Sequence, residues 1–257
     1  MECLLFGDTV SVNISLLAVE HCSLACEYCS TGAPFASKIY NSAESFCEWI
    51  DLLENKGILV PVLGITGGEP FLHPKVCDGS FITYLKKRYP FKSIILTTNF
   101  TWASEERIVK YAPIISKLTK LAISVYDHVL KKMGDDEFNR LVALLKYLCP
   151  DTIIELREYQ HFLSWEFHED RREVKGACCT SDCFILKPNG ILSHCSLAVG
   201  AQNIPKYNEI LRKTKEALLD LSQLKNKKYF SHWQKKYPLD LCFYCTMWEE
   251  KYLPHKD

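Results

Sequence analysis

Three cysteines lie close together near the start of the sequence, at Cys22, Cys26 and Cys29 within the stretch HCSLACEYCS (residues 21–30). Thiolates at positions i, i+4 and i+7 can converge on one inorganic centre, because a loop that leads into a helical turn brings the sulfurs to the same side. A structural zinc ion usually takes four protein ligands, and three only when one coordination position stays open. Three cysteines without a fourth nearby therefore favour an iron–sulfur cluster with one iron open to a substrate.

The composition limits the classes of function. The 257 residues include 31 Lys plus Arg and 31 Asp plus Glu, so the net charge is zero and gives no support to binding of nucleic acid or an anionic membrane. Glu2 and Asp8 stand where a secretory signal would place Lys or Arg, and no apolar run is long enough to span a bilayer. We therefore expect a cytoplasmic protein.

Thirteen cysteines are many for a compartment in which thiols stay reduced. Clustered cysteines in such a chain indicate metal binding or catalysis rather than disulfides. Isolated cysteines are expected only to pack in the interior, as at Cys47, Cys77 and Cys149.

Apolar, β-rich runs alternate with amphipathic segments over the first 160 residues. The strand candidates are residues 10–19, 60–66, 92–99, 120–126 and 152–159. The helix candidates are residues 42–55 (with Ser42 as the N-cap), 79–89, 104–118 and 135–148. This alternation, with near-continuous apolar strands, predicts a parallel sheet covered by helices.

We expect an α/β fold in which residues 1–170 form a partial (β/α)6 TIM-like barrel of parallel strands, with an open doubly wound sheet as the alternative. In either fold, ligands gather at the carboxyl ends of the strands. The cysteine stretch and the stretches TGGEP, TNF and YDH all lie at such ends.

The alternation stops after about residue 170. Residues 183–196 predict a β-hairpin turned by Pro188, Asn189 and Gly190, and residues 206–224 predict a helix. Residues 171–257 are therefore expected to form a small C-terminal hairpin and helix module.

The spacing Cys22-x3-Cys26-x2-Cys29, with Tyr28 before the last cysteine and a strand before the first, resembles the signature of the radical S-adenosylmethionine (radical SAM) superfamily. Three further stretches agree in order and position with that family's motifs. TGGEP (66–70) resembles its glycine-rich stretch, TTNF (97–100) its third-strand TNG, and ISVYD (123–127) its fourth-strand SxD.

The resemblance spans residues 10–160 and extends to Arg157, which falls where related members place an arginine near the cofactor carboxylate. Phe100 departs from the family's usual glycine after the asparagine, which leaves the shape of that loop open.

The resemblance implies that Cys22, Cys26 and Cys29 hold a 4Fe-4S cluster whose open iron chelates S-adenosylmethionine (SAM). One electron delivered through the cluster then cleaves SAM to methionine and a 5′-deoxyadenosyl radical, which abstracts a hydrogen atom from an unactivated carbon. Arg157 is counted with the cysteines as catalytic. The implied cofactor-binding residues are Tyr28, Gly67, Gly68, Glu69, Asn99, Ser124 and Arg157.

Each of these residues also has a purely structural interpretation. Gly67 and Gly68 allow close backbone approach to a ligand and Glu69 can accept hydrogen bonds from an ammonium group, but Gly-Gly before Glu-Pro is also simply a tight turn. Asn99 and Ser124 suit ribose or amino-acid contacts, or helix capping.

Arg157 has a planar fork suited to a carboxylate, and its alternative is an ion pair with Glu155 or Asp127. His21 and His194 adjoin cysteines and could tune a cluster, although lone histidines usually only pack.

Six further cysteines follow in the C-terminal part, and their layout resembles the Twitch or SPASM modules that bind auxiliary 4Fe-4S clusters. Because the chain has one CxxC there, we expect one auxiliary cluster, as in Twitch modules, with a structural zinc as the alternative. Which of the cysteines at 178, 179 and 183 are ligands stays open. The expected ligands are Cys178 (or Cys179), Cys183, Cys195, Cys242 and Cys245.

The resulting hypothesis is a radical SAM oxidoreductase that dehydrogenates or epimerises a sugar, cyclitol or nucleotide sugar, as resembling Twitch enzymes of aminoglycoside biosynthesis do. The expected partner is an electron donor such as flavodoxin or ferredoxin, with no nucleic acid and no membrane. The alternatives are a peptide-modifying (RiPP) maturase and a non-catalytic iron–sulfur or zinc protein.

Overall fold

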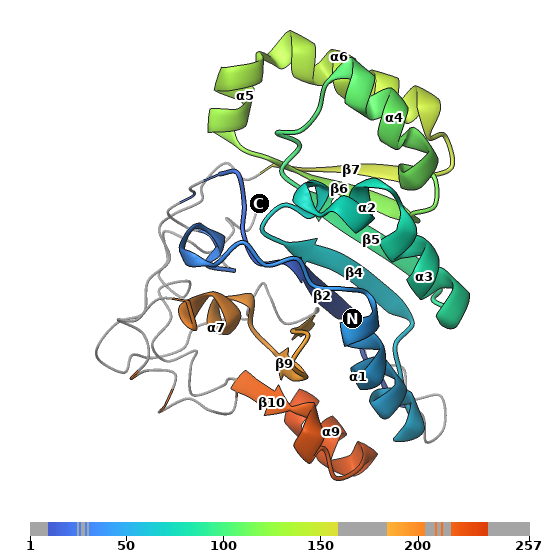
Figure 1. Cartoon of the computed structure of the whole chain (residues 1–257), viewed down its shortest axis with the longest axis vertical. Coiled ribbons are helices and arrows are strands. Elements are labelled where there is room, and N and C mark those ends of the chain that lie inside the picture. The colour runs from blue at the N-terminus through green and yellow to red at the C-terminus, as the bar shows by residue number, and fades with distance from the viewer. Residues whose placement is uncertain are drawn as a thin grey trace, which may run out of the picture.

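A computed structural model describes residues 10–24, 26, 29, 31–158, 184–203, 209, 212 and 217–235. Its centre is an eight-stranded sheet with the order β10-β9-β8-β2-β4-β5-β6-β7 (Figure 1). The strands are β2 (Ile14–Val19), β4 (Val62–Gly67), β5 (Ser93–Thr98), β6 (Lys120–Val125), β7 (Ile153–Glu158), β8 (Phe184–Leu186), β9 (Ile191–Ser193) and β10 (Leu218–Asp220). A short parallel pair, β1 (Val10–Ser11) with β3 (Ile58–Leu59), lies outside this sheet.

The predicted α/β fold with a parallel sheet is confirmed. Strands β2, β4, β5, β6 and β7 follow one another in parallel, as expected from the first 160 residues. The sixth parallel strand is β8, which comes from the C-terminal part and pairs with β2 at the other side of the sheet. The predicted hairpin is also confirmed, because β8 and β9 pair antiparallel across the turn at residues 188–190. β10 then continues the sheet antiparallel to β9.

Helices connect the parallel strands and cover the sheet. They are α1 (Glu44–Asn55), α2 (Pro74–Cys77), α3 (Ser80–Arg88), α4 (Glu105–Ile115), α5 (Asp127–Met133), α6 (Asp135–Leu148), α7 (Ser196–Ala201) and α9 (Lys227–Gln234). In Figure 1, α4 and α6 lie at the β7 edge of the sheet, whereas α9 lies beside β10 at the opposite edge.

The sequence explains where helices begin and which side they bury. In α1, Phe46, Ile50 and Leu53 recur at helical spacing and are buried. The N-cap position of α1 is Ala43, one residue after the expected Ser42, and the Oγ of Ser42 accepts a hydrogen bond from the N–H of Ser45 at 3.3 Å.

The two faces of the sheet differ in chemistry. Leu63 and Ile65 of β4 and Leu121 and Ile123 of β6 are fully buried in the core. Because side chains alternate along a strand, the residues between them point to the opposite, inner face. That inner face mixes apolar side chains with small, hydroxyl-bearing and charged ones. The apolar residues are Leu17, Ile95, Ile153 and Ile185, and the others are Ser15, Gly64, Thr66, Thr97, Lys120, Ala122, Ser124, Glu155 and Arg157.

The predicted helix over residues 206–224 is wrong at its end. Leu218, Leu219 and Asp220 form β10 and pair with β9, so sheet pairing overrides the local helix preference. The Oδ1 of Asp220 accepts the N–H of Ser222 at 2.9 Å, which makes a side-chain turn there. Of the earlier residues of that range, the structure describes positions 209, 212 and 217.

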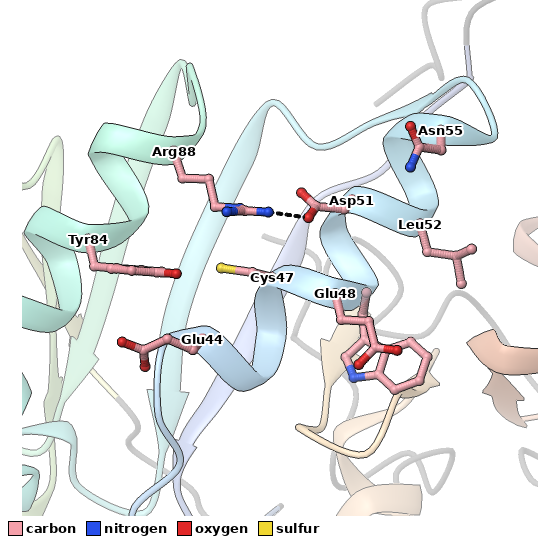
Figure 2. Close-up of a pocket in the computed structure, with 9 residues that line it drawn as sticks. Glu44, Cys47, Glu48, Asp51, Leu52, Asn55, Tyr84 and Arg88 are labelled. Carbon is pink, nitrogen blue, oxygen red and sulfur yellow. Dashed lines mark hydrogen bonds and ion pairs between the residues drawn. The ribbon is translucent and has the colours of Figure 1, made fainter.

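A hollow of about 480 Å³ lies on the outer surface between α1 and α3 (Figure 2). Arg88 of α3 forms an ion pair with Asp51 of α1 across it. None of the predicted site residues lines this hollow. The lining residues are Glu44, Cys47, Glu48, Trp49, Asp51, Leu52, Asn55, Tyr84 and Arg88. Among the described residues, no helix is both long and apolar enough to cross a membrane.

Candidate active site

The cysteine loop follows the carboxyl end of β2, and hydrogen-bond donors point at its sulfurs. The Sγ of Cys22 accepts from the backbone N–H of Leu24 at 3.4 Å and from the Nδ2 of Asn99 at 3.2 Å. The Sγ of Cys29 accepts from the backbone N–H of Ala33 at 3.4 Å. Donors of this kind stabilise a negatively charged sulfur, so the loop suits thiolate ligands.

The three thiols affect one another electrostatically. Burial raises the pKa of Cys22 to about 11, and the charges of Glu69 and Cys29 add to the rise. Burial also raises the pKa of Cys26 to about 11, with further contributions from Cys22 and Cys29. Without a positive centre the thiols of Cys22 and Cys26 therefore stay protonated, and a bound metal would replace the protons.

The described part of the chain contains no group of three His, Cys, Asp or Glu side chains close enough to hold a single metal ion. Cys22, Cys26 and Cys29 are near enough to interact, yet they are not gathered around one point.

Gly67 and Gly68 bring β4 against the cysteine loop. The N–H of Gly68 donates to the carbonyl of Val19 at 2.8 Å, and the N–H of Glu69 donates to the carbonyl of His21 at 3.1 Å. A Cβ on Gly67 would overlap the Val19 backbone, and one on Gly68 would overlap the His21 backbone. The close approach that these glycines permit is therefore to the chain itself, directly before Cys22.

Glu69 has no exposed surface, and its carboxylate accepts three hydrogen bonds. The donors are the N–H of Phe71 at 3.0 Å, the hydroxyl of Thr98 at 2.8 Å and the N–H of Asn99 at 2.7 Å. Burial raises the pKa of Glu69 to about 7, although the three hydrogen bonds oppose the rise. These three contacts within the protein fix the position of the Glu69 carboxylate, and its expected contact with a cofactor ammonium stays a prediction.

Phe100 resolves the loop whose shape the sequence left open. Its φ of 62° lies in the left-handed region, the conformation that a glycine would adopt without cost. The ring is fully buried and packs edge-on against Trp102 and Phe138, with centroids 5.4 and 5.6 Å away. Core packing therefore offsets the backbone strain, and the loop keeps a glycine-like turn.

Ser124 and Arg157 face each other in register on the last two parallel strands, β6 and β7. Ser124 is buried at the carboxyl end of β6, where a ligand-binding residue was expected. The guanidinium of Arg157 contacts Glu155, with Nη2 at 3.0 Å and Nε at 3.2 Å from one carboxylate oxygen. The ion-pair alternative for Arg157 is therefore present, and Lys120 lies 3.3 Å from the same Glu155 carboxylate.

The C-terminal part reaches the cysteine loop through α7. Cys195 directly precedes α7, whose residue Gly200 contacts Gly32, and the Nδ2 of Asn203 donates to the carbonyl of Thr31 at 3.3 Å. The segment that bears Cys195 thus packs against the loop that bears Cys29. The other expected residues lie outside the described part of the chain: Tyr28, Cys178, Cys179, Cys183, Cys242 and Cys245.

The isolated cysteines and the two histidines largely behave as expected. Cys47 and Cys149 are buried, while Cys77 packs partly exposed against the core. His194 is buried and its Nε2 lies 2.8 Å from the carbonyl of Trp233. His21 is buried, and its Nε2 lies 3.4 Å from the hydroxyl of Tyr40.

Two residues near the cysteines were not predicted. The Nε2 of His128 lies 4.0 Å from the Sγ of Cys26, and the hydroxyl of Thr31 lies 3.4 Å from the Sγ of Cys29. His128 belongs to the YDH stretch that follows β6, so its place at the carboxyl end of a strand could have indicated a site residue.

Comparisons with known proteins agree with this geometry. Residues 10–132 match the family described as the 4Fe-4S single cluster domain. The structure is similar to that of BtrN in complex with AdoMet and 2-DOIA, with a TM-score of 0.56 at 14% sequence identity, covering 93% of this chain and 94% of that chain. A search of curated proteins found no matching sequence.

Two further similarities are weaker. Native anSMEcpe with bound AdoMet and Cp18Cys peptide gives a TM-score of 0.41 at 16% identity, covering 57% of this chain and 42% of that one. SuiB of Streptococcus suis bound to S-adenosylmethionine gives 0.39 at 13% identity, covering 73% and 61%. TM-scores of this size carry no argument about function.

The family match over residues 10–132, the cysteine loop and the parallel sheet confirm the predicted resemblance to the radical SAM superfamily. Within that class, its fold resembles BtrN over nearly the full length of both chains.

Proposed function

We propose that the protein is a radical SAM enzyme that abstracts a hydrogen atom from a small polar substrate, such as a sugar, cyclitol or nucleotide sugar, and so dehydrogenates or epimerises it. The observation that carries the proposal is the similarity over nearly the full length to BtrN, whose structure holds AdoMet and 2-DOIA. That similarity includes the C-terminal part as well as the sheet.

The cysteine loop supports the cofactor part of the proposal. Cys22, Cys26 and Cys29 would hold a 4Fe-4S cluster, which supplies the electron that cleaves bound SAM. The chain places N–H donors at the sulfurs of Cys22 and Cys29. Residues at the ends of the neighbouring strands would bind SAM. Ser124 and the guanidinium of Arg157 are proposed to contact SAM, together with the backbone at Gly67 and Gly68 and the side chain of Tyr28.

The inner face of the sheet supports a polar substrate. Thr66 and Thr97 lie next to each other on β4 and β5, and Glu155 and Arg157 lie beyond them on β7. Hydroxyl groups and charges of this kind can pair with the hydroxyl groups of a sugar or cyclitol.

An auxiliary 4Fe-4S cluster is proposed for the C-terminal part, where it would accept the second electron of a dehydrogenation. Cys195 would be one ligand, and its contact with the cysteine loop through α7 supports a role close to the substrate. The further ligands would be Cys178 or Cys179, Cys183, Cys242 and Cys245. Electrons would arrive from a flavodoxin or ferredoxin.

The test is anaerobic reconstitution with iron and sulfide, reduction with dithionite and detection of 5′-deoxyadenosine. Candidate aminocyclitols and nucleotide sugars, deuterated at single carbons, are then added one at a time. A substrate should increase SAM cleavage and transfer deuterium to the 5′ carbon. Absence of cleavage under all conditions contradicts the enzyme, and deuterium transfer only from short peptides contradicts the proposed substrate class.

A further inference from the structure

Glu69 is a buried carboxylate whose three observed donors are all uncharged. Oε1 accepts from Phe71 and Thr98, and Oε2 accepts from the backbone N–H of Asn99 at 2.7 Å. Removing a carboxylate from water is costly, and it is tolerated when hydrogen bonds satisfy the oxygens. The bonds from the Thr98 hydroxyl and the Asn99 N–H hold residues 98 and 99, at the end of β5, in a fixed position.

The orientation of the Asn99 amide is fixed at both ends. Its Oδ1 accepts from the backbone N–H of Thr101 at 3.0 Å and from the Thr101 hydroxyl at 2.7 Å. A flipped amide would place two donors against the backbone donor of Thr101, so the NH₂ group must face the other way. In that direction lies the Sγ of Cys22, at 3.2 Å.

We propose that Glu69 is a positioning residue that holds the Asn99 amide against the Cys22 sulfur and thereby stabilises the reduced, more negative state of the cluster. An N–H donor to a ligand sulfur offsets the added negative charge, and such outer partners set both metal affinity and reduction potential. The inference rests on the proposed function because it makes Cys22 a cluster ligand. It gives the Glu of the TGGEP stretch a further role, which acts through Asn99.

Two near-isosteric substitutions separate the steps. Asn99→Asp keeps an oxygen for Thr101 and removes the N–H donor to sulfur. Glu69→Gln keeps the size of the side chain and can place an NH₂ group against the backbone N–H of Asn99, which pushes the turn away. The full-length reconstituted protein is measured anaerobically without SAM, by redox titration followed by electron paramagnetic resonance and by the rate of iron release to a chelator.

Both variants are expected to lower the midpoint potential of the cluster and to speed iron release about tenfold. If Glu69 acts through Asn99, the double variant should release iron no faster than Asn99→Asp alone. The matched control is Thr152→Val, which removes a buried hydroxyl that donates to the carbonyls of Ile115 and Leu118 at 3.1 and 3.3 Å. This control should lower stability without changing the potential.

An unchanged potential in Glu69→Gln, or additive effects in the double variant, would overturn the inference. The proposed function is decided separately by 5′-deoxyadenosine production in the wild type. A wild type that holds the cluster but never cleaves SAM contradicts the function alone, and normal cleavage with an unchanged potential in Glu69→Gln contradicts this inference alone. A wild type that binds no cluster contradicts both.

Discussion

Gly32 and Gly200 touch through their backbones: a Cβ on Gly32 would lie 2.6 Å from the carbonyl oxygen of Gly200. Gly32 follows the cysteine loop, and Gly200 lies in α7 just after Cys195. The contact joins two cysteine-bearing segments that are far apart in the sequence, and only residues without a side chain permit it.

Replacing Gly32 with alanine should therefore loosen this junction. The φ of 64° already costs an alanine about 1 kcal/mol, and the overlap with Gly200 adds about 1–3 kcal/mol. Gly57→Ala is the matched control, because Gly57 also has positive φ (74°) but its Cβ position meets only the Lys227 side chain, at an ordinary contact distance of 3.8 Å. Thermal unfolding and iron content should fall more in Gly32→Ala, and equal losses in the two variants would contradict the contact's importance.

Cys26→Ala should abolish SAM cleavage and remove the iron bound at the cysteine loop, because the cluster loses one of its three thiolate ligands. Cys47→Ala is the control, since Cys47 is also a cysteine but is buried in α1 against the core. It should lose only about 1 kcal/mol of stability and keep its iron. Iron analysis and 5′-deoxyadenosine assays check both, and full activity in Cys26→Ala would refute the cluster assignment.

Cys242→Ala should spare much of the uncoupled SAM cleavage while lowering product formation, because the auxiliary cluster is proposed to take the second electron. The ratio of product to 5′-deoxyadenosine measures this directly. If cleavage and product fall equally, the second set of cysteines serves mainly to stabilise the fold, since the energy of metal binding is then folding energy.

Phe100 tests the balance between strain and burial. Phe100→Gly relieves about 1 kcal/mol of backbone strain but loses a buried ring worth about 3–5 kcal/mol, so a net loss of about 2–4 kcal/mol is expected. Phe100→Ala loses the ring and keeps the strain, and it should be less stable than Phe100→Gly by about 1 kcal/mol. Denaturant unfolding ranks the three proteins, and a Phe100→Gly variant more stable than wild type would show that the ring contributes little.

The pKa of Glu69 makes stability depend on pH. Because burial raises it from 4.5 to about 7, the folded state binds the proton more tightly than the unfolded state. The resulting stabilisation is complete below pH 4.5 and is lost as pH rises toward 7. The midpoint of thermal unfolding should therefore fall with rising pH in wild type relative to Glu69→Gln. Histidines with lowered pKa act in the opposite direction but are common to both proteins. A difference between the two proteins that does not change with pH would contradict the shift.

The sequence by itself determined the local features of the protein. Hydrophobic periodicity located the helix over residues 135–148 as α6 and placed each end of the five consecutive parallel strands to within four residues. The turn residues Pro188 to Gly190 predicted the hairpin. The spacing of the three cysteines, together with three strand-end motifs, indicated the resemblance to the radical SAM superfamily. These signals are contained in neighbouring residues, so they can be read without the fold.

Tertiary structure decided what depends on residues distant in sequence. The sixth parallel strand, β8, joins the sheet beside β2, and residues 218–220 became a strand because β9 offered a partner. Folding also brought Glu69 against the backbone of Asn99 and Gly68 against the backbone of His21, which are contacts between segments distant in the sequence. Hydrogen-bond satisfaction and steric overlap depend on which segments meet, and local sequence does not specify that meeting.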